Sequence, residues 1–186
     1  MAHFYRKEQG GVMYYRIMGD SENYANLMPA DYTMDFASQF DGRSLADGWK
    51  KIHFELIDPQ DNRPLPEIAT GYIPICSKRV YEVIKDMCKG YVEFLPCTVG
   101  SENLEYYIFN ILGTSDVVDY SKSEFRFFST SNRIMFFNKI VFVKEVTLPM
   151  FRIKDLPYTY FFCTEDMKKL LDTISAEGLV FSNELF

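Results

Sequence analysis

The stretch Phe161–Phe181, FFCTEDMKKLLDTISAEGLVF, decides the fold because it can be interpreted throughout as strand, helix and strand. An aromatic run ends at Cys163, and Thr164 is expected to cap the helix that follows. Gly178 is expected to end that helix as its C′ residue, before a new apolar strand. The spacing of one helix face predicts a helix over Glu165–Ala176, with these apolar residues on the buried side: Met167, Leu170, Leu171 and Ile174.

An earlier stretch, Ile73–Phe94, follows the same plan. Ser77 is expected as the N-cap of a helix over Lys78–Lys89, and Gly90 begins the next strand. The apolar stripe of this helix is expected to comprise Val80, Val83, Ile84, Met87 and Cys88. We interpret the two stretches as recurrence of a common strand-helix-strand unit in preference to an internal duplication.

The composition favours sheet over helix. The chain has 186 residues with 17 Phe and 13 Tyr, residue types that suit half-buried sheet surfaces. Strands are predicted at Val12–Met18, Trp49–Ile57, Tyr91–Thr98, Leu104–Leu112, Phe125–Phe128, Arg133–Thr147 and Met150–Ile153, with the third and fourth paired as a hairpin. We therefore expect an α+β fold with a mostly antiparallel sheet and two principal amphipathic helices.

The pattern of strands and helices is absent from two N-terminal segments, and these segments define the domain organisation. Residues 1–11 end in two glycines and are expected to form a flexible leader, and residues 12–186 a single α+β domain. Residues 19–48 show no sustained period but carry several aromatic residues, so they predict an irregular but ordered N-terminal lobe.

The net charge of −6 and a sequence pI of about 5.0 limit the classes of partner. Nucleic-acid backbones bind clustered Lys and Arg, and the 20 basic residues here are scattered, so nucleic acid is not expected as a ligand. An acidic surface suits a basic protein partner. The same acidity also keeps a cytoplasmic protein soluble without any partner.

The sequence offers little for catalysis, a metal or a cofactor. It has four cysteines without a C-x-x-C pair and two histidines, His3 and His53, so neither a zinc site nor a disulfide framework is expected. His53 is the one plausible internal general base, and we expect it to face solvent on a strand. No known catalytic motif is present and no apolar run could span a membrane, so we predict a reduced, cytoplasmic protein that is not an enzyme.

Candidate partner-binding residues lie in two turn-rich segments. The segment Asp58–Glu67, DPQDNRPLPE, is the strongest loop signal in the chain, and a second turn follows Gly113. Loops on rigid scaffolds often carry recognition, so we take as candidates Asp58, Asp61, Glu67, Asp116 and Asp119. The competing interpretation is that these carboxylates are solvated turn residues, and that Asp116 and Asp119 cap their own backbone.

Several stretches together resemble one family, DUF1629, classed as an Imm11-like immunity protein family of bacterial polymorphic toxin systems. The resemblance runs in order from about Met13 to Phe181 and is carried by YYRI, FDGRSLADGWKKIHFEL, IPICSKRVYEVI, VEFLPCTV, YYIFNILGTSDVVD and LPMFRIKDLPYTYFFCTEDMKKLLDTISAEGLVF. It implies a cytoplasmic protein that binds and neutralises a cognate toxin domain. It implies no catalytic residues.

Two other classes remain open. A small-ligand-binding protein or an enzyme could have its site in the N-terminal lobe, lined by Tyr24, Tyr32, Phe36, Phe40 and Trp49. A structural protein could instead assemble through its aromatic strands.

Overall fold

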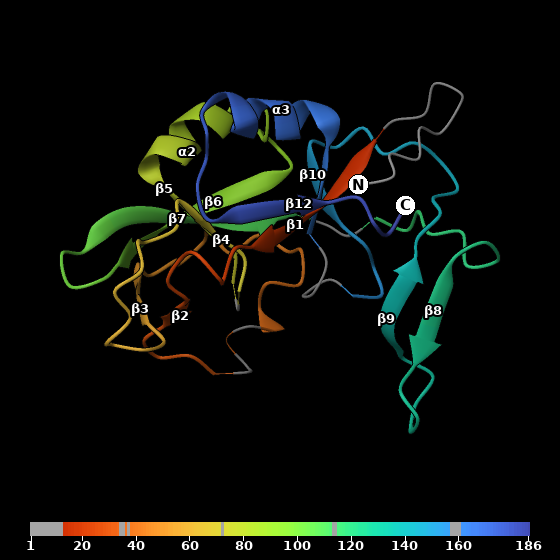
Figure 1. Ribbon diagram of the computed structural model, residues 1–186, viewed down its shortest axis with the longest axis horizontal. Coiled ribbons are helices and arrows are strands. Elements are labelled where there is room, and N and C mark those ends of the chain that lie inside the picture. Colours follow the sequence, from red (N-terminus) through yellow and green to blue (C-terminus); the bar gives the residue numbers. More distant parts are fainter. Residues whose placement is uncertain (1–12, 34–35, 37, 72, 113–114, 157–160) are drawn as a thin grey trace.

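The computed structural model describes residues 13–33, 36, 38–71, 73–112, 115–156 and 161–186 (Figure 1). Two larger sheets and the helices α2 and α3 form the body, and a two-stranded sheet projects from one end of it. The fold is therefore α+β, as the sequence predicts. The expected leader, residues 1–11, lies outside the described residues.

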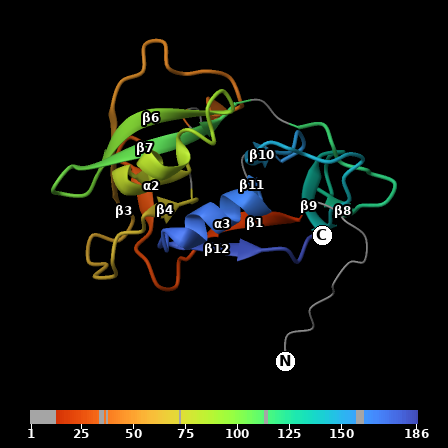
Figure 2. The same cartoon turned by 90° about the horizontal axis from the view of Figure 1, so that it is seen from above.

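One sheet has the strand order β10-β11-β1-β12, and all of its pairings are antiparallel. It brings the two ends of the described chain together, because the first strand lies between two strands from the C-terminal region (Figure 2). Its members are β1 (Tyr14–Gly19), β10 (Met150–Arg152), β11 (Phe161–Thr164) and β12 (Leu179–Ser182).

The other large sheet has the order β2-β3-β6-β7-β5-β4. Its strands are β2 (Leu27–Pro29), β3 (Ile52–Leu56), β4 (Ile68–Ala69), β5 (Ile75–Ser77), β6 (Val92–Val99) and β7 (Leu104–Ile111). The predicted hairpin is confirmed as β6 and β7, and Gly100 and Asn103 adopt positive φ in its turn. β3 pairs with β6 in parallel, so this sheet is mixed.

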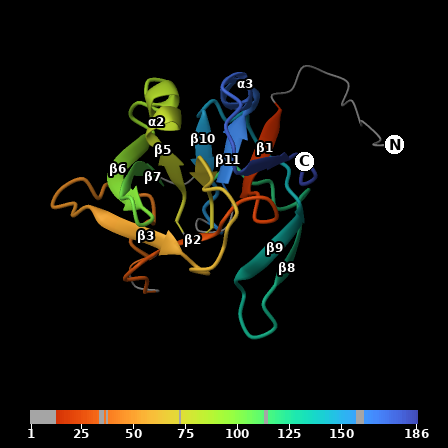
Figure 3. The same ribbon diagram turned by 60° about the vertical axis from the view of Figure 1, so that its left-hand side comes forward.

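The helices α2 (Lys78–Ile84) and α3 (Glu165–Thr173) lie side by side on one face of the body (Figures 1 and 3). α2 contacts β5 and β7, whereas α3 contacts β11 and β1. The predicted cap of α2 is confirmed, because the Ser77 hydroxyl accepts a hydrogen bond from the Val80 amide. Thr164 occupies the predicted N-cap position of α3, but its side chain makes no cap hydrogen bond.

Both helices are shorter than their apolar patterns predict. α2 ends at Ile84 instead of Lys89, and Met87, expected on the buried stripe, is exposed beyond its end. α3 ends at Thr173 because Ser175 takes the left-handed C′ position. The amides of Ser175 and Ala176 then donate to Asp172 O and Leu171 O, at 2.9 and 3.1 Å, which is the Schellman pattern.

Gly178 therefore has a different role from the predicted helix stop. Its φ is +87°, and a Cβ added there would lie 2.2 Å from Pro66 Cβ. The position needs glycine because the chain entering β12 passes directly against the loop that precedes β4.

The projecting part, which we call the arm, comprises residues 117–143 (Figures 1 and 3). It contains β8 (Glu124–Phe127) and β9 (Ile134–Lys139), paired antiparallel. Hydrogen bonds extend the pairing toward the body, from Asp119 N to Val141 O at 2.7 Å and from Val143 N to Val117 O at 2.8 Å. The single strand predicted over Arg133–Thr147 ends at Lys139, because the next amide, that of Ile140, donates to Leu185 O.

Three apolar clusters hold the elements together. One lies between the helices and the sheets and includes Val80, Ile84, Met167 and Leu171. A second joins the β6-β7 sheet to the N-terminal lobe through Phe40 and its neighbours. The third fixes the base of the arm on the β1-β11 sheet and comprises Tyr14, Val117, Val118, Ile134, Phe137, Ile140, Val146, Phe151, Ile153 and Phe162.

A buried polar network crosses between the two sheets. Arg152, 2% exposed, donates to Ile111 O at 3.0 Å, to Asn110 Oδ1 at 3.4 Å and to Phe40 O. Asn110 in turn donates to Arg43 O and to the Glu93 carboxylate. The network thus joins β10, β7 and β6 to the chain around residues 40–46.

Candidate functional site

The loop carboxylate Asp61 is held within the body. The guanidinium of Arg63 donates to both of its oxygens, and the same guanidinium donates to Ser21 O and Glu22 O. Hydrogen bonds from Arg63 lower the pKa of Asp61 to about 2. Its side chain is 8% exposed, so this ion pair fastens the loop to the turn after β1 and presents little charge to a partner.

Glu67 fastens the other end of the same loop. Its carboxylate accepts hydrogen bonds from the Arg79 guanidinium on α2 and from the Glu177 amide, and Arg79 also donates to Ile174 O at 3.0 Å. The Arg79 guanidinium holds the pKa of Glu67 below its ordinary value. Arg79 lies in the first turn of α2, where a cation opposes the helix dipole, and its ion pair with Glu67 gives it a structural role there.

The remaining candidates differ in exposure. Asp119 accepts hydrogen bonds from the amide and hydroxyl of Ser121 and pairs with Lys122 at 3.0 Å, which is the self-capped turn. Asp58 is exposed and accepts a hydrogen bond from the Gln60 amide. Asp116 is exposed, with its carboxylate 3.6 Å from Lys154 Nζ. Of the five candidates, Asp58 and Asp116 therefore present the most accessible carboxylates.

The five residues do not form one surface. Segment 58–67 lies beside β3 at one end of the long axis in Figure 1, whereas segment 115–120 lies at the base of the arm near the other end. An acidic rim built from all five would have to span the molecule.

Three of the five aromatic residues expected to line a site in the N-terminal lobe pack against one another. Phe40 stacks edge-on against Phe36 and Trp49, with ring centroids 5.5 and 6.3 Å apart, and all three pack on the β6-β7 sheet. The Trp49 indole donates to Pro96 O at 3.0 Å. These contacts account for the ordered packing of this part of the lobe, and Tyr24, another of the expected five, lines a cavity.

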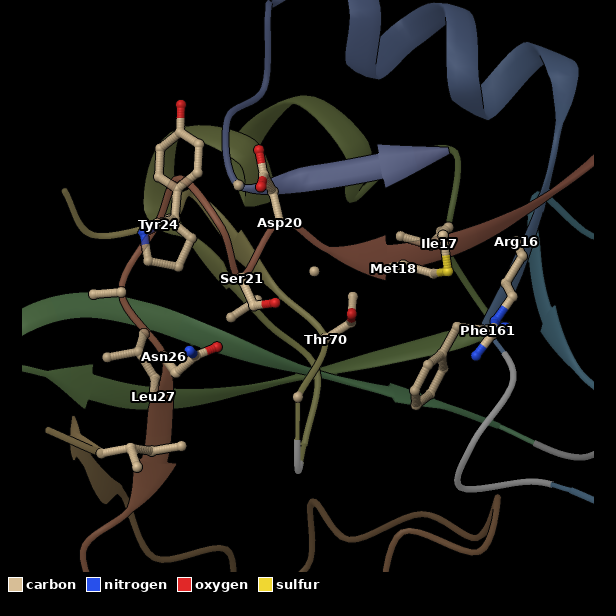
Figure 4. Close-up of a pocket in the computed structure, with 17 residues that line it drawn as sticks. Arg16, Ile17, Met18, Asp20, Ser21, Tyr24, Asn26, Leu27, Thr70 and Phe161 are labelled. Carbon is tan, nitrogen blue, oxygen red and sulfur yellow. The ribbon is translucent and has the colours of Figure 1, made fainter. Parts of the chain in front are cut away.

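That cavity has a volume of about 330 Å³ and lies where the two sheets meet (Figure 4). Ser21 and Thr70 lie near its middle, and Arg16 and Phe161 lie together at one end. Asp20 accepts hydrogen bonds from Asn23, which lower its pKa and keep it ionised. The described lining holds no His or Cys, and its polar side chains supply a carboxylate, an amide, hydroxyls and a guanidinium.

The surface of the arm was not predicted as a site. Phe127 and Phe128 are 54% and 45% exposed, and Tyr120 and Met135 are exposed as well. A hollow of about 460 Å³ on the arm is lined by Tyr120, Phe125, Phe127, Asn132, Arg133, Ile134 and Asp155. The sequence signal that could have revealed this surface is the run FRFFSTSN at 125–132, in which three aromatic residues precede a polar tip.

The other reactive groups are buried or engaged. All four cysteines are free and buried, and burial raises the pKa of Cys88, Cys97 and Cys163 to about 12, so they remain protonated thiols at neutral pH. His53, expected to face solvent, is half-buried with Nδ1 3.0 Å from Thr98 Oγ1. Among the described residues, no group of three or more His, Cys, Asp or Glu could hold a metal ion.

Three further findings bear on the class of protein. No helix in the described part of the chain is long and apolar enough to cross a membrane. No curated protein matches the sequence significantly. The model of the immunity protein family Imm11 matches residues 6–184, nearly the whole chain, in agreement with the resemblance found in the motifs. The protein therefore belongs to the Imm11 immunity protein family.

Proposed function

We propose that this protein neutralises a cognate toxin domain by binding it in the cytoplasm as a folded inhibitor. The observation that carries the proposal is the family match over residues 6–184. An immunity protein must recognise its toxin, and recognition needs an exposed, preorganised surface more than it needs reactive groups.

The chemistry of the described residues supports binding over catalysis. Protonated, buried thiols are poor nucleophiles, and the imidazole of His53 is engaged with a neighbouring strand. The cavity at the junction of the sheets contains a carboxylate, hydroxyls and the Arg16 guanidinium, and its described lining has neither a histidine nor a cysteine. These groups are consistent with a protein that inhibits its toxin by binding it.

The acidic loops support this proposal with fewer carboxylates than the five that the sequence indicated. Asp58 and Asp116 are the carboxylates that we propose as contacts for basic groups of the toxin, because both are exposed. They lie at opposite ends of the molecule, so each is a separate candidate contact. For Asp61, Glu67 and Asp119 we propose a structural role first, since internal donors already occupy them.

The test is co-expression with the toxin domain encoded beside this gene. We expect growth of cells that make the toxin to be rescued by the wild-type chain, and the two proteins to elute together in size-exclusion chromatography. Association kinetics from biolayer interferometry would give the affinity.

The control is an immunity protein of similar size from an unrelated toxin system. Neither rescue nor co-elution is expected with that protein. If the wild-type chain rescues growth without forming a complex, inhibition by binding is wrong and an enzymatic route takes its place. If it neither rescues growth nor binds, the proposed function is wrong.

A further inference from the structure

We propose that the arm, residues 117–143, is the element that docks on the toxin, and that it engages an acidic face of that domain. This inference rests on the proposed function and specifies its interface. Three features carry it: exposed apolar anchors, unpaired positive charge and a rigid base.

The apolar anchors project from the strands of the arm. Phe127 is 54% exposed, Phe128 45% and Met135 38%, and all three lie close to the turn at the end of the hairpin. Soluble proteins seldom leave neighbouring large apolar side chains uncovered, and aromatic residues and methionine are enriched where proteins bind one another. The hollow lined by Phe127 and Ile134 would receive an apolar side chain of the partner.

The charge of the arm is opposite to that of the rest of the chain. Its four basic and two acidic residues give the arm a net charge of +2, whereas the whole chain carries −6. No salt bridge joins Arg126, Arg133 or Lys139 to a carboxylate within the described part of the chain, and all three are exposed. Complementarity therefore specifies carboxylates on the surface that the arm meets.

The base of the arm is fixed on the body. Val117, Ile134, Phe137 and Ile140 are buried together with residues of the β1-β11 sheet. The hydrogen bonds between residues 117–119 and 141–143 continue the ladder to this base, and the Phe128 amide donates to Arg133 O near the tip. A surface presented on a supported hairpin loses little conformational freedom on binding, so its contacts contribute more of their energy to affinity.

A protein is favoured over other partners of a basic, aromatic hairpin. Nucleic acid would be repelled by the remainder of the chain, which carries a net charge of −8 when the arm is subtracted from the total. Four basic residues also give few phosphate contacts. A second copy of this chain would offer an acidic body to the arm, and we treat that as an alternative outcome of the experiment.

The experiment compares paired variants of the full chain in binding the co-encoded toxin domain. The charge variant is Arg126→Glu/Arg133→Glu, and the apolar variant is Phe127→Ser/Phe128→Ser. Their matched controls on the body are Lys50→Glu/Lys89→Glu, which makes the same change in net charge at exposed sites, and Met87→Ser/Tyr91→Ser, which removes exposed apolar side chains away from the arm.

The arm charge variant is expected to lower the association rate about tenfold at low salt and to weaken its salt dependence. The arm apolar variant is expected to raise the dissociation rate about tenfold to a hundredfold. Both controls are expected to bind like the wild type. Thermal melts and the fluorescence of Trp49, which packs against the β6-β7 cluster and not in the cluster at the base of the arm, establish that each variant is folded.

The outcomes separate this inference from the function it rests on. If the wild type binds toxin and the folded arm variants bind equally well, the docking inference is wrong and the proposed function stands. If the controls weaken binding as much as the arm variants, the arm is not the interface. If the wild type binds no toxin but self-associates in sedimentation, or binds duplex DNA or phosphatidylserine vesicles through the arm, both proposals are overturned.

Discussion

At the scale of single residues, the free energy of unfolding is expected to depend strongly on the buried guanidinium of Arg152. Arg152 lies between the sheets and donates to carbonyls from two different parts of the chain, Phe40 O and Ile111 O. Removing a buried group of this kind leaves its partners without a donor, which costs more than the net value of the bonds themselves. This side chain is therefore one of the groups that attach the lobe around Phe40 to the sheets.

We expect Arg152→Ala to lower the free energy of unfolding by several kcal/mol, about 1 to 3 kcal/mol for each buried acceptor that loses its donor. Arg43→Ala, which removes a guanidinium that is 63% exposed and 3.5 Å from Asp41, is expected to change it by less than about 0.5 kcal/mol. Urea unfolding followed by circular dichroism measures both. Equal effects of the two substitutions would contradict a structural role for the buried network.

The pH dependence of stability is expected to depend on Glu93. Burial alone would raise the pKa of this carboxyl, but hydrogen bonds from Ser44, Leu45 and Asn110 outweigh burial and hold it below 4.5. A folded-state pKa below the unfolded value stabilises the fold above about pH 4.5, and that contribution is lost as the pH falls through the lower value.

Glu93→Gln is therefore expected to be less stable than the wild type at pH 7, with the difference narrowing as the pH falls toward about 3. Unfolding free energies measured between pH 7 and pH 3 provide the check. A constant difference across this range would mean that the charge of Glu93 contributes nothing to the attachment of the lobe.

At the scale of elements, the starts of both helices and the β6-β7 hairpin were predictable, whereas the C-terminal ends of the helices were not. Ser77 and the turn between the two hairpin strands are local signals, and both were confirmed. The end of α3 depends on Ser175, a residue that sequence rules do not expect at a left-handed position. The parallel pairing of β3 with β6 joins strands about 40 residues apart, so no local pattern could reveal it.

The buried face of α3 is expected to be a major source of stability. Leu171 is 2% exposed and packs in the cluster shared with α2, so Leu171→Ala should lower the free energy of unfolding by about 2 to 5 kcal/mol. Lys169→Ala, on the exposed side of the same helix, is the comparison and should cost less than about 0.5 kcal/mol. A loss of less than about 1 kcal/mol for Leu171→Ala in a denaturant melt would place this residue outside the core.

The approach of β12 to the loop before β4 can be tested with two glycines of similar backbone. Gly178 and Gly90 have φ of +87° and +82°, but a Cβ at Gly178 would collide with Pro66 whereas one at Gly90 would meet no atom within 4 Å. Gly90→Ala should cost about 1 kcal/mol from backbone strain, and Gly178→Ala about 3 to 5 kcal/mol because the collision adds to it. Equal losses in thermal or urea unfolding would show that the two segments can separate without cost.

At the scale of the whole molecule, the candidate site was predictable only in its residue types. The sequence indicated which loops carry carboxylates. It did not indicate that two of these carboxylates would form ion pairs within the folded chain, Asp61 with Arg63 and Glu67 with Arg79. It indicated aromatic strands, but not that β8 and β9 would stand apart from both larger sheets with their aromatic residues uncovered. The solvent exposure of a side chain depends on the whole folded chain, so local sequence patterns reveal little about which residues form a binding surface.

This division of roles among the carboxylates leads to a test by charge reversal. Asp58→Lys/Asp116→Lys alters two exposed groups and should leave the melting temperature nearly unchanged. Asp61→Lys/Glu67→Lys should clearly lower the melting temperature. Each substitution replaces a carboxylate that accepts hydrogen bonds from an arginine by a second cation beside that arginine. Both variants change the net charge equally, so a difference between them reports the local partners and not the overall charge. Binding of the toxin is then interpretable for the first variant, since its fold is intact: slower association at low salt would support the proposed acidic contacts, and an unchanged rate would leave the arm as the surface that captures the toxin.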